Sequence, residues 1–362
     1  MTSAPIRILQ IVPNLSPHSG IVRVVLHWHR HLDTTRVQFD YLYFKPFEPN
    51  CLEEITRLGG KCTFLPYKQP LKLLAGLFRF FKQNRYAIIH SHVLQLPLFI
   101  FPLAKFYGTK YIIEHAHATR WSNKKLSAVR NYLMLHAVWP LITHRLACSE
   151  KAGRFFFKRN FSVLNNSIEA EQFAYNPQVR AQKRKELDLE NNFVIGHVGR
   201  LSSEKNHLFL IAVLEKLVCR YPNAKLILVG EGPLEQPLKN KTREKLLDKH
   251  VLFLGPRDDV PGLLQAFDVF VFPSLFEGLG LGAIEAQAAG LPCVLANTLP
   301  KEAFICNYKK MPLGSAEDWA QALLKLTADF QRKDTSELIK KADFDATQVA
   351  LKMQHFYTGL EQ

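Results

Sequence analysis

Two glutamates stand in an apolar, glycine-rich stretch of the sequence, FEGLGLGAIEAQAAGLP (276–292). Seven residues separate Glu277 from Glu285, and glycines alternate with other residues after the first glutamate. Glycines leave the main chain uncovered, so a ligand can approach it closely. Carboxylates repel phosphates but accept hydrogen bonds from adjacent hydroxyls, such as the diols of a sugar or a ribose. The stretch therefore predicts a site for a diol-bearing ligand. The structural alternative is that Glu277 caps a helix and Glu285 is a solvated helix residue.

A second stretch, GHVGRLSSEKNH (196–207), carries Arg200 and Lys205 between an apolar run and a helical pattern. Two cations beside the free N–H groups of a helix N-terminus suit a diphosphate. The alternative is that both side chains are simply solvated. Together the two stretches describe a nucleotide-sugar: cations and glycines hold the diphosphate, and the glutamates hold the diols on either side of it.

Short apolar runs and helical patterns alternate along almost the whole chain to position these residues. Runs such as FVIGHVG, AKLILVG and DVFVFP are nearly continuous, which is typical of parallel strands buried on both faces. The fold class predicted is α/β, with two doubly wound Rossmann-like domains facing across a cleft, and C-terminal helices. The length of 362 residues fits two domains.

A polar stretch, NPQVRAQKRKELDLENN, separates the two series of strands and predicts the domain boundaries. We expect an N-terminal, acceptor-side domain over 1–175, a linker over 176–192 and a nucleotide-sugar-binding domain over 193–330. Helices over 331–362 can return to the N-terminal domain.

GRLSSEKN (199–206) and FPSLFEGLGLGAIEAQAAGLPCV (272–294) together resemble the retaining glycosyltransferases of family 4, which have the GT-B fold. The closest resemblance is to the enzymes of bacterial capsule and exopolysaccharide biosynthesis. ILVGEGPL (227–234), VLFLGPRDDVPGLLQAFDVFVFPS (251–274) and ILQIVPNLSPHSGIVRVVLHWHRHLD (8–33) extend the resemblance over essentially the whole chain.

The resemblance implies catalytic and donor-binding roles for particular residues. The implied catalytic residues are Arg200 and Lys205 on the donor diphosphate, Glu277 on the transferred sugar, and His115 or His117 near its anomeric carbon. The implied donor-binding residues are Glu285 on the ribose diol, Gly278, Leu279, Gly280 and Leu281 along the sugar and phosphate, Arg257 near the base, and Gly20 on the diphosphate from the opposite domain.

Three departures from the family pattern bear on acceptor and sugar specificity. Ser19 precedes Gly20 where Gly-Gly is common, Val22 and Arg23 stand where an acidic residue is frequent, and Ala118 follows His117 where Asn is frequent. Which of His115 and His117 faces the sugar stays open, and a purely structural role for both is the alternative.

Metal and cofactor are both expected to be absent. Asp258 and Asp259 are adjacent, so they point to opposite sides of an extended chain and form no Asp-x-Asp motif. Arg200, Lys205 and helix N-termini can stabilise the leaving diphosphate instead. The nucleotide-sugar, expected to be a UDP-sugar, is a substrate.

The net charge of +15 lies entirely in the N-terminal half. Residues 1–165 hold 23 Lys and Arg against 7 Asp and Glu, whereas residues 166–362 hold 24 against 25. Basic stretches with apolar helical spacing, such as PLKLLAGLFRFFKQNR (70–85), can lie on anionic lipid. We therefore expect an anionic membrane surface as a partner. The alternative is that the apolar face of each helix packs on the sheet of its own domain, and that the excess charge only makes the surface of a soluble protein basic. Nucleic acid is not expected because no motif for it is present.

The predicted function is transfer of a sugar from a nucleotide-sugar donor to a glycan or lipid-linked acceptor, with retention, in bacterial surface polysaccharide biosynthesis. The six scattered cysteines and the missing secretory pattern lead us to expect a cytoplasmic protein, peripheral on the inner face of the cytoplasmic membrane.

A nucleotide-sugar epimerase and a non-catalytic nucleotide-sugar-binding protein are the alternatives to this function. A dehydrogenase is disfavoured because PNLSPHSG follows the first strand in place of G-x-G-x-x-G.

Overall fold

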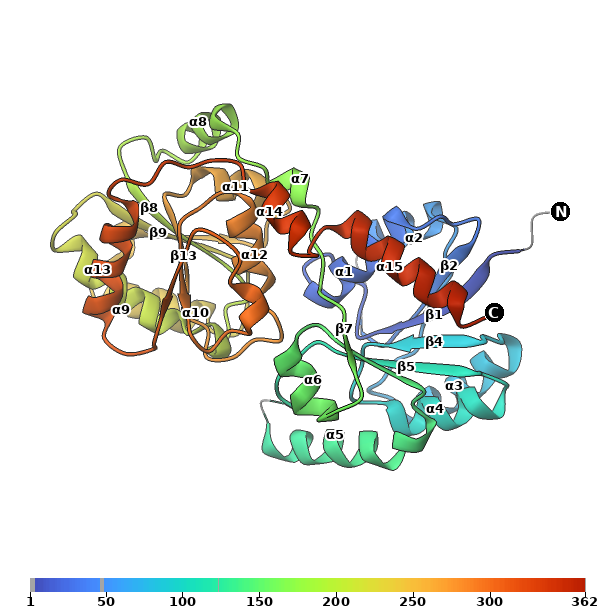
Figure 1. Cartoon of the computed structure of the whole chain (residues 1–362). Helices are drawn as coiled ribbons and strands as arrows, with labels where there is room; N and C mark the ends of the chain where they lie inside the picture. The colour runs from blue at the N-terminus through green and yellow to red at the C-terminus, as the bar shows by residue number, and fades with distance from the viewer. Residues whose placement is uncertain (1–3, 46–48, 123, 362) are drawn as a thin grey trace. The chain divides into compact units, whose positions relative to one another are not determined.

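The computed structural model describes residues 4–45, 49–122 and 124–361, and the chain divides into two compact units. Unit 1 comprises Met1–Ile168 and Asp345–Gln362, and unit 2 comprises Glu169–Phe344 (Figure 1). The chain therefore begins unit 1, builds all of unit 2, and then returns to unit 1. No helix among the described residues is both long and apolar enough to cross a membrane.

Unit 1 is built on a sheet of seven parallel strands in the order β3-β2-β1-β4-β5-β6-β7. Its strands are β1 (Ile6–Val12), β2 (Val37–Tyr43), β3 (Cys62–Phe64), β4 (Ile88–Ser91), β5 (Tyr111–Ala116), β6 (His144–Ala147) and β7 (Ser162–Val163). Its helices are α1 (Gly20–His31), α2 (Pro49–Arg57), α3 (Pro70–Gln83), α4 (Pro97–Phe106), α5 (Lys125–Ala137), α6 (Glu150–Phe157) and α15 (Ala346–Gly359), with the 3₁₀ turn η1 (Trp139–Leu141).

Unit 2 is built on a sheet of six parallel strands in the order β10-β9-β8-β11-β12-β13. Its strands are β8 (Phe193–Val198), β9 (Ala224–Val229), β10 (Val251–Gly255), β11 (Val269–Phe272), β12 (Cys293–Ala296) and β13 (Tyr308–Met311). Its helices are α7 (Ala170–Phe173), α8 (Pro177–Glu186), α9 (His207–Val218), α10 (Glu235–Glu244), α11 (Val260–Ala266), α12 (Leu281–Ala288), α13 (Ala316–Thr327) and α14 (Ser336–Lys341), with the 3₁₀ turns η2 (Ser203–Lys205), η3 (Asp248–His250) and η4 (Lys301–Ala303).

The central strands are buried on both faces, as their continuous apolar sequences predict. All seven residues of β2 are buried, and so are all four residues of β11 and all four residues of β12. Helices cover both faces of each sheet, so the predicted α/β class with two doubly wound domains is confirmed.

The polar stretch over 176–192 is not a linker but part of unit 2. It contains α8, whose Arg180 and Arg184 both pair with Asp268 at the start of β11. The helix carries no buried residue, so its sequence has the polar character of a linker. The first crossing between the units falls at Ile168–Glu169, before the predicted boundary at 175, and the second falls at Phe344–Asp345.

Candidate functional site

In unit 2 the strand order reverses between β8 and β11. These two strands are parallel neighbours, whereas β9 and β10, which lie between them in the sequence, extend the sheet on the other side of β8. Open α/β sheets bind ligands at such a point, beyond the carboxyl ends of the strands. The loop over 199–206 follows β8 and the loop over 273–280 follows β11, so most of the predicted donor-binding residues lie at this position.

Two polar contacts join these loops. The Lys205 ammonium donates to Glu277 Oε1 over 2.5 Å, and the side chains are only 15% and 12% exposed. Its Nζ also lies 4.7 Å from the ring centroid of Phe272, the last residue of β11. The Leu275 N–H donates to the Glu204 carbonyl over 2.8 Å. The structure therefore brings together Lys205 and Glu277, which lie 72 residues apart in the sequence.

Arg200 lies on the same loop as Lys205 but is exposed. Its guanidinium makes no ion pair within the described part of the chain. A cation of this kind at the switch point of the sheet is positioned to bind an anionic ligand without breaking an internal ion pair.

Two glycines at the start of α12 are required, one by its backbone conformation and one by close packing. Gly280, at the N-cap of α12, has φ +96, which a residue with a side chain rarely adopts. A Cβ on Gly282 would lie 2.9 Å from the Val198 carbonyl oxygen at the end of β8. Because α12 begins so close to β8, the N–H groups of its first turn lie beside the loop that carries Arg200. Gly278, Leu279 and Leu281 lie in the same segment, directly before or at the start of α12.

Glu285 lies inside α12 and is 1% exposed. The alternative of a solvated helix residue is therefore wrong. Burial of a carboxylate costs free energy that an exposed position would avoid. A buried glutamate at this position is therefore consistent with a binding role. The whole run Ala283–Ala288 is buried with it.

Arg257 lies after β10, two strands away from β8 in the sheet. Its guanidinium makes a bidentate pair with Asp259, with both N–O distances 2.8 Å, and Asp259 also accepts from Lys183 over 2.8 Å. The Arg257 pair, followed by the Lys183 hydrogen bond, holds the pKa of Asp259 well below its usual range. The structure therefore engages Arg257 in an ion-pair network and does not bring it to Lys205 and Glu277.

Two buried histidines under the first loop were not predicted. His197 lies near the end of β8 and His207 begins α9, and their ring centroids are 4.8 Å apart. Burial, reinforced by the charge of Lys205, lowers the pKa of His207 to about 4. A neutral imidazole pair therefore supports the loop without adding charge next to the ammonium. No motif in the sequence indicates this pair.

In unit 1 the strand order reverses between β1 and β4. Gly20 begins α1 after β1, and His115 and His117 lie at the end of the neighbouring strand β5. All three predicted residues of this unit thus lie at the carboxyl ends of strands, at or next to its switch point.

A network of four histidines occupies this edge of the unit 1 sheet. The imidazoles of His92 and His117 are linked over 2.8 Å, and those of His90 and His115 over 3.3 Å. The first pair is held at its ends by Gln10 (2.9 Å) and Asn166 (3.0 Å). The family resemblance implies roles for only His115 and His117, although the pattern HSH (90–92) matches HAH (115–117) on the adjacent strand.

The C-terminal helix completes this network. The Tyr357 hydroxyl on α15 lies 2.6 Å from His90 Nδ1 and accepts a hydrogen bond from Gln10 Nε2 over 3.1 Å. Trp28 of α1 stacks on His90 and His115, with ring centroids 6.1 and 5.9 Å apart. The ring of His115 is therefore enclosed, whereas His117 stays half-buried. Of the two candidates, His117 is the one that a ligand can reach.

His90, His92 and His115 form the one group of described residues whose ligand atoms lie close enough together, within 4.8 Å, to hold a metal ion. Both ring nitrogens of His90 and of His92 already lie within hydrogen-bonding distance of another polar atom. His90 Nε2 lies 3.3 Å from His115 Nδ1, so these two nitrogens pair with each other. The geometry therefore favours a hydrogen-bonded network over a metal centre.

The network predicts that unit 1 loses stability in mild acid. Burial lowers the pKa of His90, His92 and His115 well below the ordinary 6.5, and lowers that of His117 to about 4. Below pH 6.5 the unfolded chain binds protons that the folded network does not. The free energy of unfolding should therefore fall as the pH drops from 6.5 toward 4, by about 1.4 kcal/mol per pH unit for each histidine.

Urea unfolding followed by tryptophan fluorescence at pH 7.5, 6.5 and 5.5 measures this slope. His115→Gln should reduce it. His355→Gln, on an exposed position of α15, is the matched control and should leave it unchanged. Stability that is constant between pH 7.5 and 5.5 would contradict the assignment.

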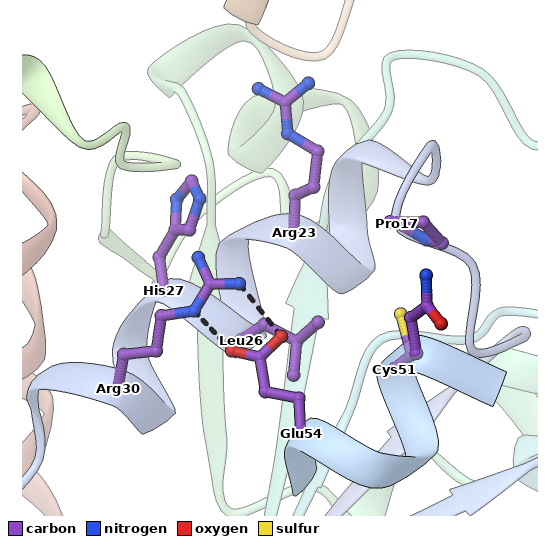
Figure 2. Close-up of a pocket in the computed structure, with 8 residues that line it drawn as sticks. Pro17, Arg23, Leu26, His27, Arg30, Cys51 and Glu54 are labelled. Atoms are coloured by element: carbon purple, nitrogen blue, oxygen red, sulfur yellow. Dashed lines mark hydrogen bonds and ion pairs between the residues drawn. The ribbon is translucent and has the colours of Figure 1, made fainter. Parts of the chain in front are cut away.

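Two cavities lie elsewhere in the units. One of about 90 Å³ lies between α1 and α2, where Arg30 pairs with Glu54 over 2.5 and 2.9 Å (Figure 2). It is far smaller than the roughly 300 Å³ that drug-sized ligands need. The other, about 500 Å³, lies beside Phe193 and Pro292 at the amino ends of the unit 2 strands, opposite the Lys205–Glu277 pair. Neither cavity contains a predicted site residue.

Comparison with known proteins places this chain among glycosyltransferases. Residues 179–343 match the family model of "Glycosyl transferases group 1". The chain is 29% identical over 371 residues to the putative glycosyltransferase EpsF of Bacillus subtilis, covering 96% of this chain and 95% of that protein. It is also 29% identical over 283 residues to an Escherichia coli UDP-Gal:alpha-D-GlcNAc-diphosphoundecaprenol alpha-1,3-galactosyltransferase, covering 74% of this chain and 73% of that enzyme.

The solved structures share the fold. Anabaena HepE, crystallised in complex with UDP and glucose, has a TM-score of 0.81 at 19% identity, covering 98% of this chain and 100% of HepE. WaaG, a glycosyltransferase involved in lipopolysaccharide biosynthesis, has a TM-score of 0.75 at 16% identity, covering 97% and 100%. At these identities the likeness supports the GT-B architecture and carries no substrate with it.

Proposed function

We propose that this chain, a glycosyltransferase of GT-B fold, moves a sugar from a nucleotide-sugar to a glycan or lipid-linked acceptor with retention of configuration, in bacterial surface polysaccharide biosynthesis. The observation that carries the proposal is the contact between Lys205 and Glu277. It joins the cationic loop and the glycine-rich loop beyond adjacent strands, at the point where α/β sheets bind ligands.

The pair can bind both halves of a sugar diphosphate. An ammonium carries three N–H groups, so Lys205 can donate to phosphate oxygens while it donates to Glu277. Arg200 supplies a second cation on the same loop. As the bond between the anomeric carbon and the diphosphate oxygen breaks, negative charge grows on that oxygen, and both cations stabilise it. A carboxylate accepts several hydrogen bonds, so Glu277 can accept from hydroxyls of the sugar while it holds Lys205.

We propose a UDP-sugar as the donor and a diphosphate-linked lipid glycan as the acceptor class. The support is by similarity: the Escherichia coli relative uses UDP-Gal and a diphosphoundecaprenol-linked acceptor, according to its name, and HepE binds UDP and glucose. Such an acceptor lies in the cytoplasmic membrane, so we place the enzyme on the inner face of that membrane as a peripheral protein. His117 is the group of unit 1 proposed to lie near the reacting carbon.

The proposed reaction uses neither metal nor cofactor. Lys205 and Arg200 take the role of charge stabilisation, and Asp259, the acidic residue nearest to a metal-binding pattern in the sequence, is already paired with Arg257 and Lys183. Equal transfer rates with Mg²⁺ and with EDTA are the expected result. A strict requirement for a divalent ion would overturn this part of the proposal.

Glu285 provides the test of donor binding. Its carboxylate is proposed to accept hydrogen bonds from the ribose diol, and charge-assisted bonds contribute about 1.5–3 kcal/mol each. Glu285→Gln, which keeps the volume of this buried side chain, should weaken UDP binding about tenfold or more in calorimetry. Glu337→Gln on the exposed side of α14 is the matched control. Unchanged UDP affinity in Glu285→Gln would remove this residue from the site.

A transfer assay separates the proposed activity from the two alternatives. Incubation with UDP-sugar and a lipid-linked acceptor should release UDP and extend the acceptor. An epimerase would convert the UDP-sugar without any acceptor and without release of UDP. A binding protein would do neither, although a thermal shift would still detect the nucleotide-sugar.

A further inference from the structure

Three consecutive helices of unit 1 carry apolar side chains that point into solvent. On α3, Leu71, Leu74 and Phe78 follow the spacing i, i+3, i+7, and all three are exposed, Leu71 by 85%. A neighbouring face of the same helix is buried through Leu73 and Leu77. An apolar stripe that stays exposed beside the buried face is not explained by the packing of the unit.

The same pattern recurs on α5. Leu126, Val129 and Leu133 again follow i, i+3, i+7 and are exposed, Leu126 by 87%. Between α3 and α5 in the sequence, α4 exposes Leu98, Phe99 and Phe106, the last by 78%. Two helices thus share one spacing of exposed apolar residues, and the third adds two aromatic rings.

The three helices that carry these residues lie side by side. Helix α4 packs against both α3 and α5, and all three contribute to the hydrophobic core on the same face of the unit 1 sheet (Figure 1). We call the outward side of these three helices the α3–α5 face. Twelve of the 21 large hydrophobic side chains that are exposed among the described residues lie within 64–133, so the exposure is concentrated on and beside this face. Concentrated apolar exposure marks an interaction surface.

The charge of the segment that builds the α3–α5 face is almost all positive. Residues 64–139 contain eleven Lys and Arg and a single acidic residue, Glu114. Ten of the eleven cations are exposed, and Lys105 is half-buried. Glu114 is fully buried, and burial raises its pKa well above the ordinary value, so it places no negative charge on the surface. A partner of this face must be anionic and must also accept apolar side chains.

We infer that the α3–α5 face docks on an anionic lipid bilayer, with the exposed leucines and phenylalanines inserted among the acyl chains and the surrounding lysines and arginines on the headgroups. Amphipathic helices that combine exposed Leu and Phe with basic residues bind membranes in this manner. The inference rests on the proposed function and deepens it, because a lipid-linked acceptor would then lie in the surface on which the enzyme rests.

Two other partners fit the face less well. In a symmetric dimer the same patch meets itself, so the eleven cations of one copy would oppose those of the other without acidic residues to pair with. Nucleic acid would satisfy the cations, but its phosphate backbone offers nothing to the exposed leucines. A bilayer with anionic headgroups satisfies both.

Co-sedimentation with vesicles tests the inference without any transfer reaction. The full chain should bind vesicles of phosphatidylglycerol and phosphatidylcholine (about 30:70) at least about tenfold more tightly than vesicles of phosphatidylcholine alone, and the preference should fall in high salt. Equal binding to both vesicles, or binding to neither, would overturn the inference. An enzyme that transfers sugar to a soluble acceptor but fails this assay would leave the proposed function intact and remove only the docking face.

Apolar substitutions separate insertion from simple charge attraction. The triple variant Leu71→Ser, Leu126→Ser, Leu133→Ser should lower the affinity for anionic vesicles about tenfold or more. Its fold should be retained, because all three side chains are exposed. The matched control replaces two exposed leucines of unit 2, Leu208→Ser and Leu246→Ser, and should bind as the original chain does. Equal loss in both variants would overturn the assignment to the α3–α5 face.

Charge reversal and the state of assembly complete the test. Lys72→Glu, Arg79→Glu and Lys125→Glu together should abolish the preference for phosphatidylglycerol, whereas Lys301→Glu and Lys309→Glu in unit 2 should not. Light scattering should find the same mass for the original chain and for the triple serine variant. A dimer that the serine substitutions dissociate would assign the face to a second copy of the chain and overturn the inference.

Discussion

Arg200→Ala is expected to lower kcat for sugar transfer by about 10²–10³-fold while leaving the fold intact. The guanidinium is exposed and makes no ion pair within the described residues, so its removal breaks no internal ion pair. In the proposed reaction it stabilises the charge that develops on the departing diphosphate, and loss of one such group typically costs two to three orders of magnitude in rate. Steady-state kinetics with UDP-sugar and acceptor measure the effect.

Two controls make this result specific. Arg220→Ala removes another exposed arginine of unit 2, which pairs with Glu317 at the surface, and should keep the original rate. Arg200→Lys keeps the charge but loses the planar fork, so it should recover only part of the activity. Wild-type turnover in Arg200→Ala would remove this residue from the site.

The Lys205–Glu277 pair is expected to show strong coupling in a double-mutant cycle. Lys205→Ala leaves a carboxylate that is 12% exposed without this cation, and Glu277→Ala leaves an ammonium that is 15% exposed without this anion. Each single substitution should lower the free energy of unfolding by about 1–3 kcal/mol, since it leaves a mostly buried polar group without one of its partners. The double variant should lose less than the sum of the two.

Transfer rates of the same three variants test the chemical role of the pair. Each single substitution should reduce the rate at least about a hundredfold, because one removes a cation from the diphosphate and the other removes an acceptor of sugar hydroxyls. Urea unfolding and transfer kinetics on one set of proteins separate stability from catalysis. Strictly additive stability changes together with unchanged rates would show that the pair is neither coupled nor catalytic.

The interior of the fold was predictable because buried parallel strands have a distinctive sequence. The apolar runs that become β1, β8 and β11 are continuous, and their order fixes the α/β class. The edge strands β7 and β13 were not predicted because most of their residues are exposed and carry no apolar run. Helix α8 has the sequence of a linker because ion pairs, and not buried side chains, hold it to unit 2.

The donor loops were predictable because their chemistry is local. Glycines, cations and glutamates at short spacing indicate a binding site through residue type alone. Direct contact between Lys205 and Glu277 was not predictable, because it depends on β8 and β11 being neighbours in the sheet. The hydrogen-bond partners of the histidines were even harder to predict. Tyr357 lies 267 residues from His90 in the sequence, and no local pattern indicates that they meet.

The division of unit 1 between two parts of the chain has a consequence for biosynthesis. Ribosomes deliver residues 1–168 long before residues 345–361, with the whole of unit 2 made in between. Until α15 emerges, the residues that later pack against Val349 and Met353 stay uncovered, and Gln10 lacks the Tyr357 hydroxyl to which it donates. The half that emerges first is therefore finished last, so the nascent polypeptide exposes an incomplete core throughout the time needed to translate the other half.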